Sequence, residues 1–423
     1  MGVIFKIKVD GTSYMKLLDF DSIKGSSPRG SLIFDGTFLY GMTLTGGSHN
    51  LGVIFKIKPD GSGYSKLIDF TGPNGSNPFG SIVLEGTYLW GMTKLGGANN
   101  RGLIFKIKSD GTGYSQIINF TSLTTGILSE GTLISDGTFL YGMTTGSVTG
   151  DTSGGGGMSG GEIFKIKLDG TNYSCLHHFG NVITDGVSPC GALTYDGTFL
   201  YGMTPTGGIN DTTFGGVGTI FKIQTDGTGY TKLHDFSNSN LDGSYPNGSL
   251  ISYEGILFGM TNTGGWSSCG FGTLFEINTD GTGFEVLLNF SGLNAGSGGD
   301  GKNPAGSLIS DGTSLFGMTS GGGTNNLGTI FKFHPTGMSV AEFDKENTIN
   351  VYPNPSKGNF QISSAKKQIL SSDIYNLLGE KIVQFEINNS TSEIDLSDKP
   401  NGIYFIKIKT EEGVVSKKII VNR

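Results

Sequence analysis

The stretch SLIFDGTFLYGMT (residues 31–43) consists of two short apolar runs separated by Asp35-Gly36. Asp-Gly between β-prone runs is the strongest short hairpin signal, because a tight turn needs positive φ angles that glycine adopts without steric cost. The phrase GTFLYGMT, which begins at Gly36, returns unchanged at residues 137–144 and 197–204, and close variants occur at three further places. The stretch therefore predicts an antiparallel hairpin that the chain repeats.

A second hairpin precedes the first in every unit. In the first unit it reads GVIFKIKVDGTSYMKLLDF (residues 2–20), with two apolar runs around the turn VDGTS. Each unit thus holds four short β-segments and no helical apolar period, which predicts a four-stranded antiparallel sheet. The units follow one another at spacings of 50 to 59 residues and begin at Gly2, Gly52, Gly102, Gly161, Gly218, Gly272 and Gly328.

Four-stranded sheets that recur at about this period are typical of β-propeller blades. One such sheet cannot bury both of its faces, but blades arranged radially cover each other, which explains why both faces of segments such as GVIFKI are apolar. We therefore predict an all-β fold with a β-propeller over residues 1–343. A β-solenoid is the alternative, although its coils are shorter and parallel, and tight Asp-Gly hairpins fit it poorly.

The innermost strand usually opens a propeller blade, so GSLI is predicted as the first strand of each blade and YMKLLDF as the outermost. Residues 2–20 are then half a blade, whose open edge would favour aggregation. Since Met1 also runs directly into repeat sequence, with no visible signal peptide, we expect that the natural N-terminus is absent and that the intact parent has seven blades. Complete blades are expected at residues 31–70, 81–120, 132–179, 192–236, 249–290 and 307–343.

The strand FLYGMT has a distinct side-chain pattern. Alternation places Tyr40 and Met42 on one face and Leu39 and Gly41 on the other. A glycine inside a strand marks the close approach of another group. Flexible methionines fill gaps well, so we expect them between blades rather than in a ring around a soft metal, since no cysteine or histidine repeats beside them. They are Met42, Met92, Met143, Met203, Met260 and Met318.

The composition excludes several function classes. Of 423 residues 73 are glycine, yet 28 phenylalanines and 15 tyrosines indicate a folded, turn-rich protein. A net charge of −7 without any basic stripe argues against nucleic acid as the natural partner. The sequence contains no run of eighteen apolar residues, so no transmembrane helix is predicted. Cys175, Cys190 and Cys269 lack metal-type spacing; the first two could pair, but free, semi-buried thiols are the favoured interpretation.

After Phe343 glycine becomes sparse and lysine dense, which predicts a domain boundary. We assign residues 344–348 to a linker and residues 349–423 to a second domain. Short alternating runs separated by Pro, Gly and Asn turns predict a small antiparallel β-sandwich there.

Four motifs of this second domain occur together: VYPNPSKGNF (351–360), IYNLLGEKI (374–382), DLSDKPNGIYFIKI (395–408) and the terminal KKIIV (417–421). In this combination the domain resembles the type A C-terminal sorting domain of the type IX secretion system of Bacteroidota. The resemblance implies export by the type IX machinery after Sec transport, which requires a signal peptide, and a released or surface-attached product. The residues that carry it are Tyr352, Pro353, Asn354, Pro355, Gly358, Gly379, Gly402, Tyr404, Lys417 and Lys418.

The repeats follow the pattern LYGMT…GG…N…GxIFKI…DGT…Y…L.DF over residues 2–343 and resemble the GloVer tandem repeat. The third repeat departs from it, because TTGSVTGDTSGGGGMSGG replaces the short TxxGGxxN link. The resemblance implies a surface or secreted location and no settled activity.

No residue is predicted to be catalytic, to bind a cofactor or to bind a metal. The five histidines have no metal spacing, no Ser/His/Asp or Cys/His arrangement stands out, and the glycine-rich links precede strands rather than phosphate-binding helices. The aspartates that precede glycine are explained by turn formation. These are Asp10, Asp60, Asp110, Asp169, Asp226 and Asp280.

The two kinds of loop are expected on opposite propeller faces. Tight Asp-Gly turns share one face, whereas long and variable links share the other, and binding residues concentrate on such loops held by a rigid scaffold. Trp266 is the foremost candidate, because an aromatic ring beside amides suits sugar stacking. The candidate residues on the link face are Asn50, Asn99, Asn100, Phe214, Trp266 and Asn325.

These observations favour a secreted or cell-surface module for adhesion to, or binding of, a glycan or protein. A glycan hydrolase or lyase is the alternative and needs two carboxylates about 5–10 Å apart. Glu130, Glu162, Asp185 and Asp242 are candidates, but they belong to different repeats. A structural spacer without a ligand is the second alternative.

Overall fold

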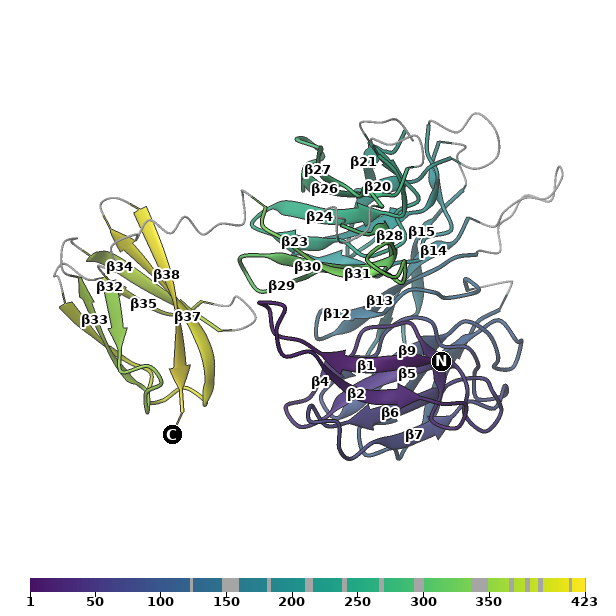
Figure 1. The fold of residues 1–423 in the computed structure, drawn as a ribbon, viewed down its shortest axis with the longest axis horizontal. Helices are drawn as coiled ribbons and strands as arrows, with labels where there is room; N and C mark the ends of the chain where they lie inside the picture. The colour runs from purple at the N-terminus through teal and green to yellow at the C-terminus, as the bar shows by residue number, and fades with distance from the viewer. Residues whose placement is uncertain are drawn as a thin grey trace. The chain divides into compact units, whose positions relative to one another are not determined.

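The structure is a computed structural model that contains strands and no helix in its described part, so the all-β prediction is confirmed (Figure 1). Two compact units are present: Met1–Ser310 with Leu315–Phe333, and Asp311–Ser314 with His334–Arg423. The predicted linker at 344–348 lies outside the described residues. These are residues 1–121, 125–146, 160–180, 184–209, 216–237, 242–265, 270–292, 300–335, 349–364, 369–376, 381–386, 391–410 and 413–422.

The first unit consists of consecutive antiparallel sheets built on one plan. It opens with the predicted two-stranded hairpin of β1 (Gly2–Lys6) and β2 (Met15–Phe20). Three sheets with four strands in chain order are β8 (Val83–Glu85), β9 (Tyr88–Thr93), β10 (Leu103–Lys108) and β11 (Ser115–Asn119); β12 (Ile134–Ser135), β13 (Phe139–Thr144), β14 (Glu162–Lys167) and β15 (Ser174–His178); and β17 (Thr194–Tyr195), β18 (Phe199–Thr204), β20 (Thr219–Gln224) and β21 (Thr231–Asp235).

A fourth sheet of the same plan has β23 (Ile251–Tyr253), β24 (Ile256–Thr261), β26 (Thr273–Asn278) and β27 (Glu285–Asn289), and two other sheets vary the plan slightly. The sheet after the first hairpin has β3 (Ser26–Pro28), β4 (Ile33–Phe34), β5 (Leu39–Thr45), β6 (Val53–Ile57) and β7 (Ser65–Asp69). The last has β28 (Lys302–Pro304), β29 (Ile309–Ser310), β30 (Leu315–Gly321) and β31 (Thr329–Phe333), and most of its expected outer strand lies outside the described residues. Short pairs join β16 (Gly186–Val187) to β19 (Thr206–Gly207), and β22 (Gly243–Ser244) to β25 (Thr263–Gly264).

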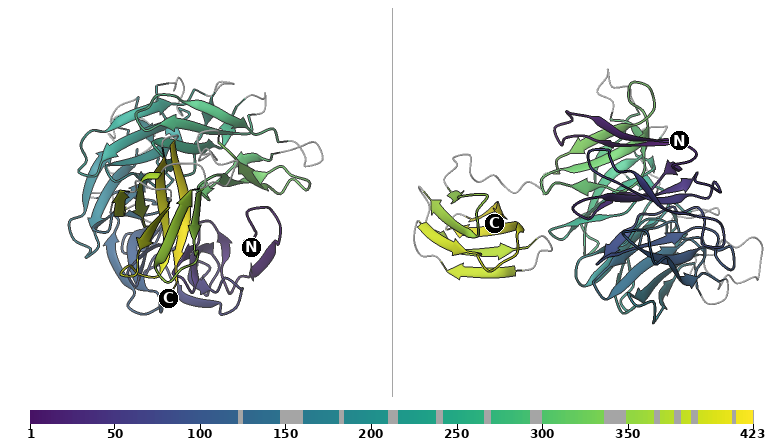
Figure 2. Two further views of the ribbon diagram at one scale, coloured as in Figure 1. Left: turned by 90° about the vertical axis from the view of Figure 1, so that its left-hand side faces the viewer. Right: turned by 90° about the horizontal axis from the view of Figure 1, so that it is seen from below.

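Apolar cores lie between successive sheets, as a propeller requires. Tyr141 and Met143 of β13, for example, pack in one buried cluster with Leu200 of β18 and Phe221 of β20. The same arrangement recurs at each junction from the first hairpin to the sheet of β23–β27. Figure 2 (left) shows these sheets following one another around an arc. The fold of this unit is therefore of the propeller type.

Glycines allow the backbones of the innermost strands of neighbouring sheets to approach each other closely. A Cβ on Gly30 would lie 2.4 Å from the carbonyl oxygen of Gly80, and each corresponding glycine meets the next in the same way. This close backbone approach confirms that GSLI-type segments are the innermost strands. The series runs through Gly30, Gly80, Gly131, Gly191, Gly248 and Gly306.

Two predictions for the FLYGMT strand are confirmed. A Cβ on Gly41 would lie 2.7 Å from the Phe55 ring on the paired strand, so this position has room only for glycine. The methionine side chains fill the gaps between sheets, with exposed fractions of 1–4% for five of them. Met318 in the last sheet is the exception, at 51%.

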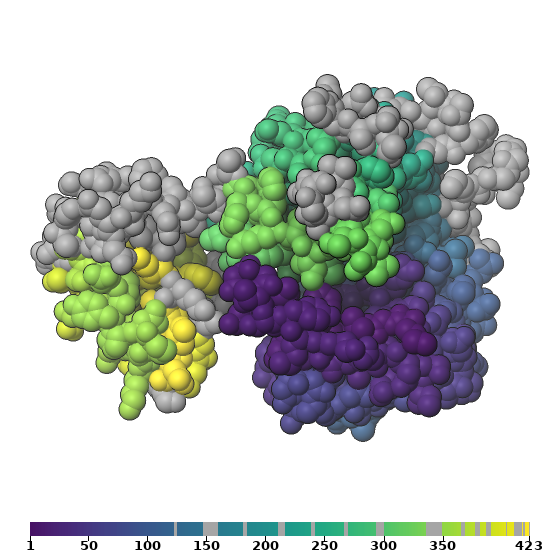
Figure 3. Space-filling view, viewed as in Figure 1, coloured from purple at the N-terminus to yellow at the C-terminus, as the bar shows by residue number. Residues whose placement is uncertain are grey.

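The two ends of the arc expose apolar side chains that are buried in the other sheets. In the last sheet Ile330 is 45% exposed, whereas Ile54, its counterpart on β6, is fully buried. In the first hairpin, which stands at the surface in Figure 3, Ile7 is 36% exposed, whereas Ile57 is fully buried. Both terminal sheets therefore lack a neighbour on one face in the described part of the chain.

The second unit is a two-sheet β-sandwich, as predicted. One sheet contains β32 (Ile349–Tyr352), β33 (Asn359–Ser364) and β36 (Thr391–Asp395). The other contains β35 (Lys381–Glu386), β34 (Ile369–Tyr375), β37 (Gly402–Thr410) and β38 (Gly413–Val421). Alternate residues of both sheets, such as Ile362, Ile374 and Ile406, form one buried core.

Candidate functional site

The Asp-Gly turns occupy one end of the sheets and are nearly identical. In the first of them the Thr12 hydroxyl and backbone N–H both donate to the Asp10 carboxylate, at 2.6 and 2.8 Å, and these bonds lower the pKa of Asp10. Backbone bonds such as Ser109 N–H to the Thr87 carbonyl join the two turns of one sheet, so both lie at the same end. The predicted role of the repeated aspartates in turn formation is confirmed.

The links lie at the opposite end, where they hydrogen-bond to each other, as in Gly97 N–H to the Gly72 carbonyl. Asn50 and Asn100 have positive φ angles, and their side-chain oxygens each accept a backbone N–H within their own turn at 3.0 Å. The Asn99 amide donates to the Phe120 carbonyl, and Asn325 is exposed. Phe214 and Trp266 lie outside the described residues. A role of these side chains in ligand binding stays a prediction.

A β-bulge gives each described outer strand an unusual geometry. Residues three apart in a strand normally point to opposite faces, but the register shift in β7 leaves Leu67 without a partner on β6. Lys66 and Asp69 therefore lie on one face and form an ion pair of 2.8 Å. Lys16–Asp19 and Lys232–Asp235 repeat this pair with distances of 2.6 and 2.8 Å.

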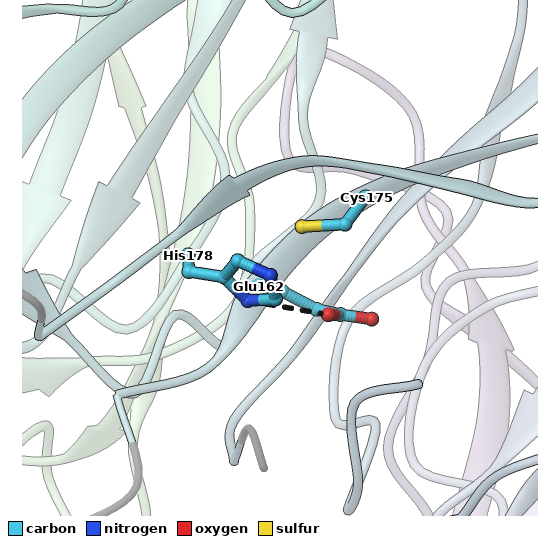
Figure 4. Close-up of side chains that lie close together, drawn as sticks. All are labelled: Glu162, Cys175 and His178. Atoms are coloured by element: carbon cyan, nitrogen blue, oxygen red, sulfur yellow. Dashed lines mark ion pairs between the residues drawn. The ribbon is translucent and has the colours of Figure 1, made fainter. Parts of the chain in front are cut away.

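In the sheet of β12–β15 a different cluster stands in the place of this ion pair. Cys175 and His178 of β15 occupy the Lys and Asp positions, and Glu162 of β14 is the direct cross-strand partner of His178. Figure 4 shows the three side chains directed toward one another. Their thiol sulfur, imidazole nitrogen and carboxylate oxygen all lie within 4.8 Å of one another.

Glu162 is the buried member of this cluster, with a side chain only 2% exposed. One of its oxygens, Oε1, accepts the Gly126 N–H at 2.6 Å and also the Tyr173 hydroxyl. The other oxygen, Oε2, lies 3.6 Å from His178 Nδ1. Burial, and then the nearby Glu162 carboxylate, raise the pKa of the Cys175 thiol to about 12. Sequence spacing gave no sign of this cluster.

Two histidine–aspartate pairs occupy the link ends of the next junctions. His177 Nε2 lies 3.0 Å from Asp185, and its ring stacks on Tyr230 with centroids 3.7 Å apart. The Tyr230 hydroxyl donates to the same carboxylate at 2.6 Å. Burial opposes ionisation of Asp185, but the bonds from His177 and Tyr230 keep its pKa below the ordinary value.

The second pair is looser. His234 Nε2 lies 3.3 Å from Asp242, and its ring stacks on Phe284 with centroids 3.9 Å apart. Phe284 has no hydroxyl to match that of Tyr230, and the Asp242 carboxylate instead accepts the Ser237 hydroxyl and backbone N–H.

The carboxylates considered for an enzyme therefore each have partners of their own. Glu130 forms an ion pair with Lys94, while Glu162, Asp185 and Asp242 are held as described above. Cys175 and Cys190 are free thiols, and Cys269 lies outside the described residues. Whether any carboxylate takes part in catalysis stays open to test.

The motif residues of the second unit tie its first strand to its last. The Asn354 side-chain oxygen accepts the Ile420 N–H at 2.9 Å, and backbone bonds join Ser356 to Ile420 and Asn422. Gly358 has a φ of 124°, and a Cβ there would lie 2.7 Å from the Ser397 Cα.

The other motif residues have varied surroundings. Tyr404 is buried and donates to the Pro400 carbonyl at 2.9 Å. Gly402 pairs with Val421 across β37 and β38. The side chains of Tyr352, Pro353 and Pro355 are exposed, and that of Lys417 is half-buried. Gly379 and the side chain of Lys418 lie outside the described part.

Family models match both units. Residues 1–152 and 146–297 match the Gloeobacter/Verrucomicrobia repeat. The chain belongs to this repeat family. Residues 350–422 of this Gloeobacter/Verrucomicrobia repeat protein match the secretion system C-terminal sorting domain, so both resemblances are confirmed. No curated protein matches the chain in sequence.

Solved structures resemble this repeat protein in fold at low sequence identity. A GH74 enzyme of Niastella koreensis is 12% identical, with a TM-score of 0.52 over 98% of this chain and 62% of its own. PorZ, an essential surface component of the type IX secretion system of Porphyromonas gingivalis, is 13% identical, with a TM-score of 0.48 over 98% of this chain and 55% of its own. This chain thus spans less than two thirds of both proteins. At such identity the GH74 similarity supports the propeller-type fold alone.

The sorting domain indicates where this repeat protein goes. It marks the chain for export by the type IX secretion system, which implies contact with that machinery and a secreted or cell-surface location. Within the described ranges, no helix has the length and apolar character needed to cross a membrane.

Proposed function

We propose that the repeat protein is a binding or adhesion module that recognises an extracellular glycan or protein through the link ends of its sheets. The observation that carries this proposal is the uneven distribution of unusual side chains. At the turn ends one Asp–Thr or Asp–Ser arrangement recurs from sheet to sheet. At the link ends the side chains change from one repeat to the next.

Some of the side chains that differ between repeats at the link ends are able to bind metals or transfer protons. The Glu162–Cys175–His178 cluster and the two His–Asp pairs occupy three successive junctions. A uniform scaffold with local variation at one end is the usual design of a recognition surface, because a rigid framework presents variable groups at little entropic cost. The sorting domain supports an extracellular ligand, since it directs the chain out of the cell.

A glycan array with the full-length chain tests this proposal. Binding should fall when the predicted link residues Asn99, Trp266 and Asn325 are replaced by alanine one at a time. The exposed turn-end changes Lys58→Ala and Lys108→Ala are matched controls and should leave binding unchanged. Equal loss of binding from both sets of variants would contradict a link-end site.

The same protein separates the alternatives. Release of shorter sugars from an array-positive polysaccharide, abolished by Glu130→Gln, Asp185→Asn or Asp242→Asn, would favour a hydrolase or lyase. Neither binding nor turnover on glycans and on surface-protein extracts would favour a structural spacer.

A further inference from the structure

The sheet of β12–β15 differs from the equivalent sheets at three positions whose side chains lie close together. The position of Glu162 holds an uncharged residue in the other repeats, namely Val53, Leu103, Thr219, Thr273 or Thr329. The position of Cys175 holds Lys66, Gln116, Lys232 or Val286, and that of His178 holds Asp69, Asn119, Asp235 or Asn289. Three changes scattered along a repeated sequence have thus introduced a carboxylate, a thiol and an imidazole at one place.

The strand geometry directs the three side chains to one face. Glu162 pairs with His178, and Phe164 pairs with Cys175, while the bulge leaves Leu176 between them without a partner. Because Glu162 and Phe164 are two residues apart in β14, their partners point to the same side of the sheet. The bulge that serves an ion pair in other repeats therefore brings two metal-binding side chains together here.

Glu162 is held ready for a further partner. Its Oε1 accepts two hydrogen bonds, from the Gly126 N–H and the Tyr173 hydroxyl, which fix the carboxylate and leave Oε2 directed toward His178. The corresponding tyrosines Tyr64 and Tyr114 donate instead to backbone carbonyls of the preceding link. Outer partners that orient a ligand in this way are typical of metal sites.

The spacing suits one tetrahedral ion. Ligand bonds of about 2.0–2.3 Å place neighbouring ligand atoms roughly 3.3–3.8 Å apart. The separation of Glu162 Oε2 from His178 Nδ1 is 3.6 Å, and all three ligand atoms lie within 4.8 Å of one another. Small side-chain rotations at Cys175 and His178, both only partly buried, would close the remaining distance.

We propose that Glu162, Cys175 and His178 supply three ligands of a tetrahedral zinc ion. Thiolate and imidazole ligands favour zinc over calcium or magnesium, which prefer oxygen ligands. One thiolate and one carboxylate balance the double charge of the ion. On binding, the Cys175 thiol gives its proton to solvent as the sulfur–zinc bond forms. The His178 side chain is 37% exposed, which leaves an entry path on that side.

The test uses the tag-free, full-length chain, freed of metal with a chelator and titrated with Zn²⁺ and, as a spectroscopic probe, Co²⁺. We expect one equivalent to bind, Zn²⁺ to raise the thermal unfolding temperature, and Co²⁺ to give a thiolate-to-cobalt absorption band. Absence of the band, or equal binding of Ca²⁺ and Mg²⁺, would overturn the proposal.

Matched variants assign the ligands. Glu162→Thr, Cys175→Lys and His178→Asp together reproduce the residues of the next repeat, Thr219, Lys232 and Asp235, so this triple variant should fold and lose both the band and the stabilisation by Zn²⁺. Cys190→Ser and Cys269→Ser should keep both. Tyr173→Phe, which frees the carboxylate from one hydrogen bond, should weaken Zn²⁺ binding by about 10-fold to 100-fold. Unchanged binding in this triple variant, with its fold verified by circular dichroism, would refute the site.

Discussion

Gly248 faces the carbonyl oxygen of Gly306 so closely that a Cβ on Gly248 would lie 2.1 Å from it. Each inner strand is thus separated from the next by backbone alone. The series stops at Gly306, whose added Cβ would meet no atom within 4 Å in the described part of the chain. The stability of the first unit should depend on these contacts in ways that can be measured.

Gly248→Ala is expected to destabilise the first unit by about 3 kcal/mol, because neither backbone can move without disturbing a neighbouring sheet. Gly321→Ala is the control, since the atoms nearest to its Cβ would belong to the Lys302 side chain and not to a backbone. Denaturant unfolding of the two variants measures the difference. Equal losses would mean that the inner strands adjust easily.

Met143→Ala should cost about 2–5 kcal/mol, because the side chain is 1% exposed and fills a junction between two sheets. Met318→Ala in the last sheet should cost less than about 1 kcal/mol, because its side chain is 51% exposed. Thermal and urea unfolding provide the comparison. A large loss from Met318→Ala would show that something covers this face in solution.

Asp185 should make the protein more sensitive to acid. Its pKa is lowered in the folded state, so its contribution to stability is present above the unfolded pKa of about 4 and is lost as the pH falls through the lower folded value. Asp185→Asn should therefore reduce the difference in unfolding free energy between pH 7 and pH 3. The difference would stay unchanged if the His177 and Tyr230 contacts had no effect on ionisation.

A hairpin added before Gly2 should stabilise the chain. A copy of residues 30–51, the inner hairpin with its link, can extend β1 inward and cover apolar side chains such as Ile309 and Met318, with a gain of about 1.5–3 kcal/mol for each one buried. A Gly/Ser extension of equal length is the control. If both extensions left the unfolding temperature unchanged, the exposed faces would have to be suited to water as they are.

Much of the first unit could be predicted from the sequence, because Asp-Gly turns and apolar runs act locally. The positions of Gly41 and Met42 followed from strand alternation and a repeating period. The Glu162 cluster could not be predicted in this way, because Cys175 and His178 point to opposite faces in a regular strand. Only the bulge at Leu176, which depends on pairing with β14, brings them together. Glu162 is a candidate carboxylate in the sequence, but its partners depend on register and on the position of Gly126 in the preceding link.

The exposure of apolar side chains in the terminal sheets could not be predicted from local sequence either. Met318 and Met42 belong to the same sequence phrase, yet only one is buried, because burial depends on whether a neighbouring sheet is present. The link asparagines have a local role that the sequence did not predict: the side-chain oxygens of Asn50 and Asn100 each accept a backbone N–H within their own turn.

The sharing of every apolar core by two neighbouring sheets has a consequence for cooperativity. Energetically, the first unit resembles a linear array, in which the cost of opening one sheet depends on whether those beside it remain closed. Opening should begin at the hairpin β1–β2 and at the sheet of β28–β31, and proceed inward, so that the amide hydrogens of β13 and β14 exchange last. A repeat lost or gained in the middle of the chain would then be tolerated better than a defect in any single junction.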